Sequence, residues 1–400
     1  MKRPHKLLVI VLAALMLLHL SGCLNPVSLD KYGYVMTVGV DEGKDKKYEI
    51  VLVLQRESSG ESVTDEGGAI ILSDEGDTIF EAVNTLYQRL SYELNFSRTH
   101  LFVFGKGIAK SGGMEEFFSI SLDKLRIRQS AMVMVCDCGV KDFLGGRGSN
   151  NEANLTKVQE NLLTDEKTVG QIVITNLAKL FEACDGGRFD VAMTYGYIND
   201  KILTDAKQKD NAVSGDNPIA DAKGKVGGMQ SYMKGAALFD GWKMVDTLSA
   251  HDTQILNIAS GRFKSGSISL KADTGEQYAL LAQLDDYSVS IDMDDGVNAT
   301  ISLTISITIE QDLTKELGSQ WEKKGKKMVT DYFTDELMRI AKRCQKYKSD
   351  ALGLGRAVSR KFKTVREWED FDWKQVYPDA DIEFEVDVIL SDYYIAITRQ

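Results

Sequence analysis

The stretch from residue 299 to residue 311, ATISLTISITIEQ, alternates strictly between apolar and polar side chains. A period of two residues indicates a β-strand, because successive side chains of a strand point to opposite faces of a sheet. One face carries serine and threonine up to Thr308 and then Glu310, which indicates contact with solvent. The opposite face is predicted to lie in a core and consists of Ile301, Leu303, Ile305, Ile307 and Ile309.

The second half of the chain combines further strands with two helices. Ser249 and Asp252 suit a helix start and Gly261 a helix end, so residues 250–260 are predicted to be helical. Asp240-Gly241 is a typical tight-turn pair between two short strands. The other predicted elements are a long helix at 317–347 and strands at 266–272, 277–284, 286–293 and 380–400.

Strands and helices interleave in the first half. Thr78 and Glu81 form a capping-box pattern at the start of a predicted amphipathic helix. This interleaving predicts mixed α/β layers rather than an all-α or all-β domain. We therefore expect an α+β fold with largely antiparallel sheets. The predicted strands are 32–41, 48–57, 100–105, 129–138 and 188–198, and the predicted helices are 79–91, 114–125 and 166–184.

A chain of 400 residues is longer than one hydrophobic core usually serves. The clearest boundary is the stretch 200–228, which is rich in Lys, Asp and Gly and has few large apolar residues. We interpret it as a linker or long surface loop. The predicted division is a signal peptide at 1–22, an N-terminal domain at 23–199, this linker, and a C-terminal domain at 229–400.

The N-terminus has the pattern of a secretory signal. A basic stretch, Met1–Lys6, precedes the apolar run Leu7–Leu20. The fourteen residues of this run would cover about 21 Å as a helix, less than the ~30 Å hydrocarbon core of a bilayer. Small residues, Ser21 and Gly22, follow the run and precede Cys23. The alternative is an uncleaved membrane anchor that Cys23 merely follows.

The four residues Leu20-Ser21-Gly22-Cys23 resemble a bacterial lipobox. In such proteins the cysteine sulfur receives a diacylglyceryl group, the signal is cut before the cysteine, and the new amine is acylated. The resemblance implies cleavage between Gly22 and Cys23 and lipidation of Cys23, with membrane lipid as the partner of the attached chains. Two or more acyl chains hold a protein firmly on a bilayer.

The charge of the chain excludes some partners. The formal net charge is −11, and a chain that begins at Cys23 would lose three basic residues and no acid, which gives −14. A body this acidic does not attract phosphate backbones, so we expect no nucleic-acid partner. The net charge also argues against adhesion to anionic lipid by a polybasic patch.

We find no sequence motif of a hydrolase, a zinc protease, a redox dithiol or a phosphate-binding loop. His100 begins a predicted strand and is interpreted as structural, and His251 as solvated in the first turn of its helix. We therefore predict no enzyme activity, no catalytic residue and no cofactor. Four thiols and two histidines after Cys23 leave no metal site of the usual spacing, and we interpret these cysteines as small hydrophobes: Cys136, Cys138, Cys184 and Cys344.

Three charged or glycine-containing stretches allow more than one interpretation. A lysine patch on the long helix could meet an acidic partner or lipid head groups, or be a solvated helix face. The pairs Asp285-Asp286 and Asp294-Asp295 are expected at turns, or else they could hold Ca²⁺ weakly, although no EF-hand loop surrounds them. Gly353 and Gly355 indicate a structural corner, or else a docking site for another subunit. The lysine patch consists of Lys323, Lys324, Lys326 and Lys327.

Several segments together resemble the Ger(x)C family, the C subunits of nutrient germinant receptors in endospore-forming bacteria. They occur in the family's order and spacing over nearly the whole chain after Cys23. The leader LNPVSLD after the cysteine departs from the family pattern, as does the stretch 200–228. The matching segments are YVMTVGVDEGKDKKYEIVLVL, GDTIFEAVNTLYQRLSYELNFSRTHLFVFGKGIAKSG, KGAALFDGWKMVDTLSAHDTQILNIASGRFKSGSISL, and CQKYKSDALGLGRAVSRKF with WEDFDWKQVYPDADIEFEVDV.

The resemblance implies a fold of several mixed α/β subdomains side by side. It also implies a lipoprotein on the outer, extracytoplasmic face of the spore inner membrane. It implies assembly with two integral membrane subunits, A and B, in a complex that responds to nutrients and starts germination, with no catalytic activity in the C subunit. The alternatives are a solute-binding lipoprotein that captures the germinant directly and an envelope hydrolase. Direct binding of a small molecule stays open at this point.

Overall fold

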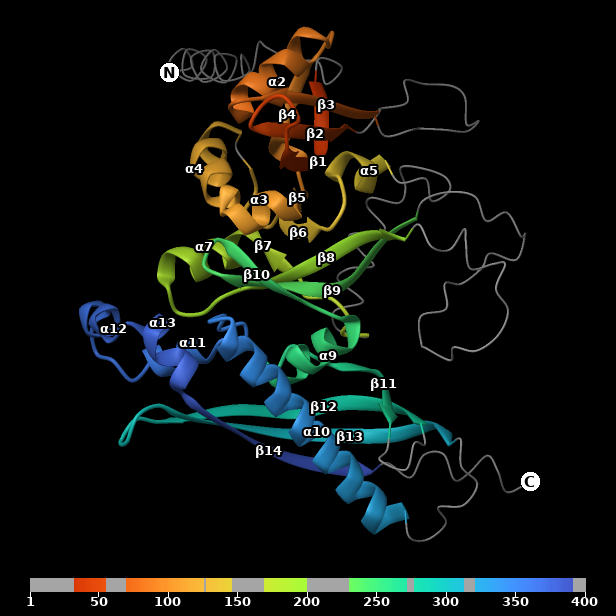
Figure 1. Cartoon of the computed structure of the whole chain (residues 1–400), viewed down its shortest axis with the longest axis vertical. Helices are drawn as coiled ribbons and strands as arrows, with labels where there is room; N and C mark the ends of the chain where they lie inside the picture. The colour runs from red at the N-terminus through yellow and green to blue at the C-terminus, as the bar shows by residue number, and fades with distance from the viewer. Residues whose placement is uncertain are drawn as a thin grey trace, which may run out of the picture.

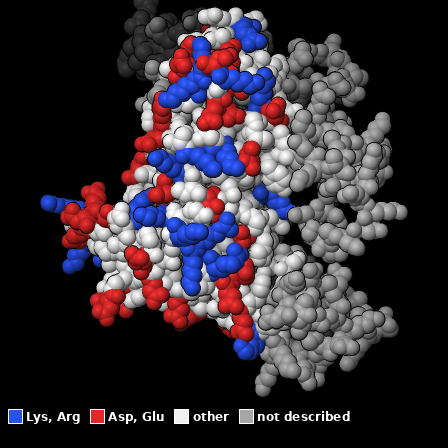
Figure 2. All heavy atoms as spheres, in the orientation of Figure 1, with Lys and Arg blue, Asp and Glu red and all other residues white. Residues whose placement is uncertain are grey.

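The computed structural model describes residues 32–54, 70–125, 127–145, 169–199, 230–271, 277–312 and 321–390. Strands within these ranges form two sheets, one of ten strands and one of four. Figure 1 shows the two sheets along an elongated molecule, with helix α9 (Ala250–Ala259) between them and helix α10 (Trp321–Lys346) crossing the smaller sheet. The same face carries both basic and acidic side chains (Figure 2).

The large sheet has a parallel centre and antiparallel ends, in the order β10-β9-β8-β6-β5-β1-β2-β3. The central strands β5 and β6, with sequences LFVFG and MVMVC, are buried along their whole length, as expected for parallel strands covered on both faces. Short strands β4 and β7 pair with β1 and β6. The strands are β1 (Tyr32–Glu42), β2 (Tyr48–Leu54), β3 (Ile70–Gly76), β4 (Glu93–Asn95), β5 (Leu101–Gly105), β6 (Met132–Cys136), β7 (Thr175–Asn176), β8 (Ala192–Asn199), β9 (Gln230–Asp240) and β10 (Lys243–Leu248).

Helices cover both faces of the large sheet and give it two cores. One core contains side chains of α2, α3, α4 and α7, and its centre is a cluster of edge-to-face aromatic rings from Phe102, Phe104, Phe117 and Phe118. The other core lies under α5. The helices are α2 (Ile79–Gln88), η2 (Phe96–Arg98), α3 (Lys106–Ser111), α4 (Gly113–Leu125), α5 (Val140–Gly145) and α7 (Leu177–Gly186).

The smaller sheet is built from β11, β12, β13 and β14, and its last pair is parallel. The predicted alternation of β13 is confirmed: Ile301, Leu303, Ile305 and Ile307 are at most 2% exposed, and they face the core that α10 covers. The remaining elements are β11 (Ser265–Lys271), β12 (Gln277–Asp292), β13 (Asn298–Asp312), β14 (Asp381–Leu390), α11 (Leu354–Ser359), α12 (Val365–Phe371), α13 (Trp373–Val376) and η4 (Tyr377–Asp379).

Helix α9 joins the two sheets through one continuous core. All eight residues from Asp252 to Ala259 are buried. The same core contains Ala236 and Leu238 from the large sheet and Leu280 and Ile301 from the smaller one. A helix that is buried on every side has no solvated face, so the two sheets cannot separate without exposing it.

The mixed α/β fold with largely antiparallel sheets is confirmed. The division at 200–228 stays a prediction. Of the strands that follow it, β9 pairs with β8 of the large sheet and β10 pairs with β9. Two element predictions were wrong. Residues 277–292 form one strand with a register shift between Leu284 and Asp286, rather than two strands. In the segment 166–184 the helix α7 begins only at Leu177, and the described residues before it are not helical.

The alternation of β13 gives a matched test of the smaller sheet. We expect Ile305→Ala to lower the free energy of unfolding by about 2–5 kcal/mol, because it opens a cavity in the core. Thr304→Ala, one residue away on the opposite face, should cost no more than about 1 kcal/mol. Urea unfolding followed by tryptophan fluorescence measures both. Equal losses for the two variants would contradict the assigned faces.

Candidate functional site

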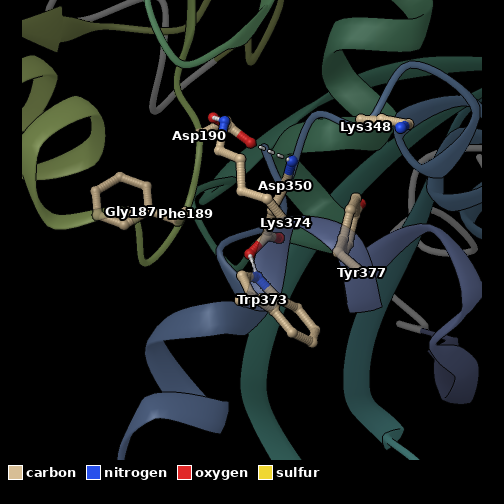
Figure 3. Close-up of a pocket in the computed structure, with 8 residues that line it drawn as sticks. All are labelled: Gly187, Phe189, Asp190, Lys348, Asp350, Trp373, Lys374 and Tyr377. Carbon is tan, nitrogen blue, oxygen red and sulfur yellow. Dashed lines mark hydrogen bonds and ion pairs between the residues drawn. The ribbon is translucent and has the colours of Figure 1, made fainter. Parts of the chain in front are cut away.

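Four polar side chains meet at a buried point between the two sheets: Asp190, Asp350, Trp373 and Lys374 (Figure 3). Asp190 lies just before β8 of the large sheet, whereas the other three follow α10. The two aspartates are only 5% and 2% exposed. Buried carboxylates are costly unless they are paired or hydrogen-bonded, so their partners define the site. We call these four residues the aspartate joint.

The Asp350 carboxylate accepts four hydrogen bonds. Three come from the backbone N–H groups of Gly353, Leu354 and Gly355, at 2.9, 2.9 and 2.7 Å. The fourth comes from the indole Nε1–H of Trp373 at 2.9 Å. The backbone donors lie where α11 begins, and the first N–H groups of a helix have no partner within it. Asp350 therefore supplies the acceptors that this short helix needs.

The two glycines of this corner are required by geometry. Gly353 has φ +80°, a left-handed conformation that a residue with a Cβ rarely adopts. A Cβ on Gly355 would lie 1.9 Å from the carbonyl oxygen of Arg188, which belongs to the segment before β8. The interpretation of Gly353 and Gly355 as a structural corner is therefore confirmed. The corner also brings the backbone of the C-terminal part against that of the N-terminal part.

Asp190 continues the network into the large sheet. Its carboxylate accepts hydrogen bonds from the backbone N–H of Gly241 at 2.8 Å and of Asp350 at 2.9 Å. The ammonium group of Lys374 lies 2.9 Å from the same carboxylate and also pairs with Asp240. In return, the backbone N–H of Asp190 donates to the carbonyl of Asp350 at 3.1 Å. Both aspartates thus tie the β9–β10 turn to the corner after α10.

Burial controls the ionisation of the joint. It raises the pKa of Asp350 to about 7, and the donors Gly355, Trp373 and Leu354 oppose this rise. Burial also raises the pKa of Asp190, against the attraction of Lys374. A buried network of this kind adds little net stability, but removal of one member leaves the others unpaired and is strongly destabilising.

The joint is packed too tightly to hold a ligand. Eight residues line a shallow recess around it, including Phe189, Lys348 and Tyr377 (Figure 3). The space between them does not admit a water molecule. The Tyr377 hydroxyl is buried in this packing and has no hydrogen-bond partner. The recess therefore offers no position for a substrate next to the carboxylates, and its geometry fits a structural connection.

A second polar network lies where α9, α10 and β10 meet. The guanidinium of Arg343 contacts Asp246 at 2.7 Å, Asp252 at 2.9 Å and the Thr247 carbonyl at 2.8 Å. Arg339 pairs with Asp252 at 2.5 Å. Hydrogen bonds and charge attraction from Arg339, with a further attraction to Arg343, hold the pKa of Asp252 below its usual value despite its burial. This arginine network fixes α10 against the edge strand of the large sheet.

The two histidines do not meet each other or a nucleophile. His100 lies next to the start of β5, its Nδ1 is 3.3 Å from the carbonyl of Arg98, and burial lowers its pKa. His251 is not simply solvated, because its Nε2 lies 3.3 Å from both the Glu336 carboxylate and the Tyr332 hydroxyl. Glu336 also pairs with Arg339, so these contacts of His251 adjoin the arginine network.

The four cysteines of the described ranges are free thiols. Burial raises the pKa of Cys184 and of Cys344 to about 12, which keeps both protonated. The thiol of Cys136 is completely buried and donates to the carbonyl of Cys138 at 3.1 Å. No group of three or more His, Cys, Asp or Glu side chains in the described part of the chain is placed to hold a metal ion.

Other predicted positions have mixed outcomes. Asp294-Asp295 lie in the turn after β12, but Asp285-Asp286 lie within β12, so the prediction of a turn there was wrong. Of the lysine patch, Lys326 and Lys327 pair with acidic side chains. The side chains of the patch's other two lysines lie outside the description, and so do Gly22 and Cys23. Among the helices within the described ranges, none is long and apolar enough to cross a bilayer.

The sequence patterns did not single out the aspartate joint. A usable signal was present, because Asp190 and Asp350 each stand in an apolar, glycine-containing stretch, GGRFDVA and SDALGLG. An acidic residue in such surroundings is often buried with its own set of donors. What the sequence could not show is that two such residues, 160 positions apart, contact each other.

Comparison with known proteins identifies the class. The family model "Spore germination protein N-terminal domain" matches residues 25–196, and the model "Spore germination B3/ GerAC like, C-terminal" matches residues 234–393. These matches cover most of the chain and define a spore germination protein. The chain belongs to the Ger(x)C family, the C subunits of germinant receptors.

A solved structure has a similar fold. The crystal structure of the GerBC protein superimposes with a TM-score of 0.52 at 11% identity, over 88% of this chain and 96% of that chain. At this identity the likeness concerns the fold alone. No curated protein matches the sequence.

Removal of the Asp350 carboxylate tests the joint. We expect Asp350→Ala to lower the free energy of unfolding by at least about 3 kcal/mol, because four buried donors lose their acceptor. The matched control is Asp379→Ala, an exposed aspartate of the same region, which should cost under about 0.5 kcal/mol. Denaturant titration measures both variants. A loss for Asp350→Ala as small as that of the control would refute the structural role.

The raised pKa of Asp350 gives a pH dependence with a definite sign. Because the pKa of Asp350 is higher in the folded chain, at about 7, than in the unfolded chain, the folded state binds more protons between about pH 4 and pH 7. Its contribution to stability is therefore lost as the pH rises through this window. The stability difference between the native chain and Asp350→Ala should shrink from about pH 5 to about pH 8. A constant difference would contradict the shift.

Proposed function

We propose that this chain is the lipid-anchored, non-catalytic C subunit of a spore nutrient germinant receptor. The signal peptide is cleaved between Gly22 and Cys23, and Cys23 carries the acyl chains. The body lies on the extracytoplasmic face of the spore inner membrane and acts by assembly with the integral membrane subunits A and B. The observation that supports this most is the Leu20–Cys23 lipobox directly before a body that both family models match.

The anchor suits the physics of the chain. The apolar run Leu7–Leu20 is shorter than a bilayer-spanning helix and leads directly to the cysteine. A buried acyl chain contributes about 0.8 kcal/mol per CH₂ group, so two or more chains give stable attachment. Acylation of Cys23 would therefore hold an acidic body at a membrane that the net charge of −14 of the cleaved chain does not favour.

Action by contact, rather than by chemistry, is supported by the packing of the joint. Its carboxylates are fully occupied by fixed donors, and the recess beside them has no room for a ligand. This recess does not favour the solute-binding alternative, which needs a cleft with convergent polar groups. The buried helix α9 and the aspartate joint connect the two sheets, so a contact on one sheet can be transmitted to the other.

The anchor is tested by Cys23→Ala. We expect this variant to keep its signal peptide and to be released from washed membranes more easily than the native chain, because it lacks acyl chains. Cys184→Ala is the matched control, since it also removes one thiol but leaves the lipobox intact. Membrane fractionation and mass spectrometry of the N-terminal peptide are the measurements. A native N-terminal peptide with a bare thiol would refute the anchor.

The same strains test assembly. The tagged native chain should co-purify with the A and B subunits from detergent-solubilised spore membranes, and so should the Cys184→Ala variant. Calorimetry of the purified chain with amino acids and sugars addresses the rival function. Clear binding at micromolar concentration, without the A and B subunits, would favour direct germinant capture instead.

A further inference from the structure

Basic side chains gather on one face of this acidic protein. Figure 2 shows Lys and Arg along the middle of the face in view, over α3, β10 and the C-terminal half of α10. Five exposed lysines lie on α3, β10 and α10 or directly after α10, and no ion pair within the described ranges joins them to a carboxylate. We call them the basic band: Lys110, Lys243, Lys342, Lys346 and Lys348.

Packing contacts make the band continuous across three elements. Gly112 directly follows α3, and the side chain of Lys243 on β10 lies against it. A Cβ on Gly112 would be 3.4 Å from the Lys243 side chain. Arg343 binds Asp246 and the Thr247 carbonyl of β10, so this turn of α10 lies along the same strand. Lys342 and Lys346 project from that turn and the next. Lys348 lines the recess of the aspartate joint (Figure 3).

Three acidic side chains beside β10 and α10 are neutralised by other cations. Asp240 pairs with Lys374, Asp246 with Arg343, and Asp252 with both Arg343 and Arg339. These pairs use arginines and one half-buried lysine, and they leave the exposed lysines of the band unpaired. The band therefore carries five positive charges without an ion-pair partner among the described residues, although the net charge of the chain is −11.

We infer that the basic band is the surface that lies on the anionic lipid of the bilayer. This inference rests on the proposed lipid anchor. Tyr32, where the described chain begins, comes nine positions after Cys23, and an extended chain of this length spans about 30 Å. An anchored body thus stays within reach of the membrane surface, where its orientation is set by its charge.

Lysine chemistry favours a lipid surface over a shaped partner. Lysine ammonium groups are hydrated point charges on flexible stems, whereas planar, bidentate recognition of a particular carboxylate or phosphate is the property of arginine. The recess at the Lys348 end of the band does not admit a water molecule, so it offers no shaped binding site. Exposed lysines on such a surface fit a fluid layer of anionic head groups. Attraction of this kind decays within a Debye length and is weakened by salt.

Lysine footprinting of the native protein tests the inference without mutation. The chain purified from membranes, which by the proposal is lipidated and begins at Cys23, is reconstituted in vesicles of neutral lipid, or of neutral lipid with roughly 30–40% anionic phosphatidylglycerol, which gives a strongly anionic leaflet. An amine-reactive ester labels exposed lysines, and mass spectrometry measures the rate at each site. We expect the band to be labelled at least about threefold more slowly on anionic vesicles, with protection lost in high salt. The internal controls are Lys44, Lys141, Lys361 and Lys363, which are exposed outside the band.

A charge-removal variant provides the second measurement. Four band lysines are changed to glutamine, Lys110→Gln, Lys243→Gln, Lys342→Gln and Lys346→Gln, and the four control lysines are changed in a matched variant. Both lose the same charge. A fluorophore on the band variant should show at least about a twofold loss of quenching by nitroxide-labelled anionic lipid, and the control variant should keep the native value.

The outcomes separate this inference from the proposed anchor. A chain that floats with the vesicles but shows equal labelling of band and control lysines on both lipids overturns the inference and leaves the anchor intact. A chain that does not float refutes the anchor, and its labelling with anionic vesicles still reports whether the band binds them. Protection that needs the A and B subunits and occurs equally on neutral lipid also overturns the inference, and would assign the band to an acidic protein surface.

Discussion

The exchange of hydrogen bonds between Asp190 and Asp350 is the contact on which the arrangement of the molecule depends. Each residue donates its backbone N–H to the other, once to a carboxylate and once to a carbonyl. The two residues come from the large sheet and from the corner after α10. Because both carboxylates are buried, neither can exchange its partner for water without a large cost. The joint therefore fixes the smaller sheet to the larger one at a defined position.

A polar joint adds what the apolar core between the sheets cannot supply. The core around α9 is large, and apolar contact is non-directional, so it favours closeness without defining one register. The hydrogen bonds to Asp350 and Asp190 form in only one relative position of the two parts. The close approach of the Gly355 backbone to Arg188 also requires that position. We interpret the two as complementary, since the core provides most of the free energy and the joint and the arginine network define the orientation.

Local sequence patterns were sufficient for most elements, and contacts between distant residues were not. The strict alternation of β13 and the caps at Thr78 and Ser249 predicted their elements well, because each pattern reports the immediate surroundings of the backbone. The helix predicted from residue 166 began too early, because the Asn257 side chain of α9 donates to the carbonyls of Gly170 and Ile172 and holds that segment in a non-helical conformation. The apolar residues of that segment pack into two different cores rather than along one face of a helix, with Val173 in the core around α9 and Ile172 in the core under α5. The aspartate joint could not be predicted, since no local pattern encodes a contact across 160 positions.

The distribution of charge shows why net charge is a poor guide to orientation. Composition argued against adhesion to anionic lipid, and for the whole body at a distance that argument is sound. Within a Debye length of about 8–10 Å, however, a surface responds to its nearest charges rather than to the total. The arginines that neutralise Asp246 and Asp252 leave the lysines beside them without an ion-pair partner within the described ranges. The ion pairs that fix α10 against β10 thus also leave the lysines of the basic band free to face a membrane. The packing of α10 and the proposed orientation of the body on the membrane therefore have the same physical origin.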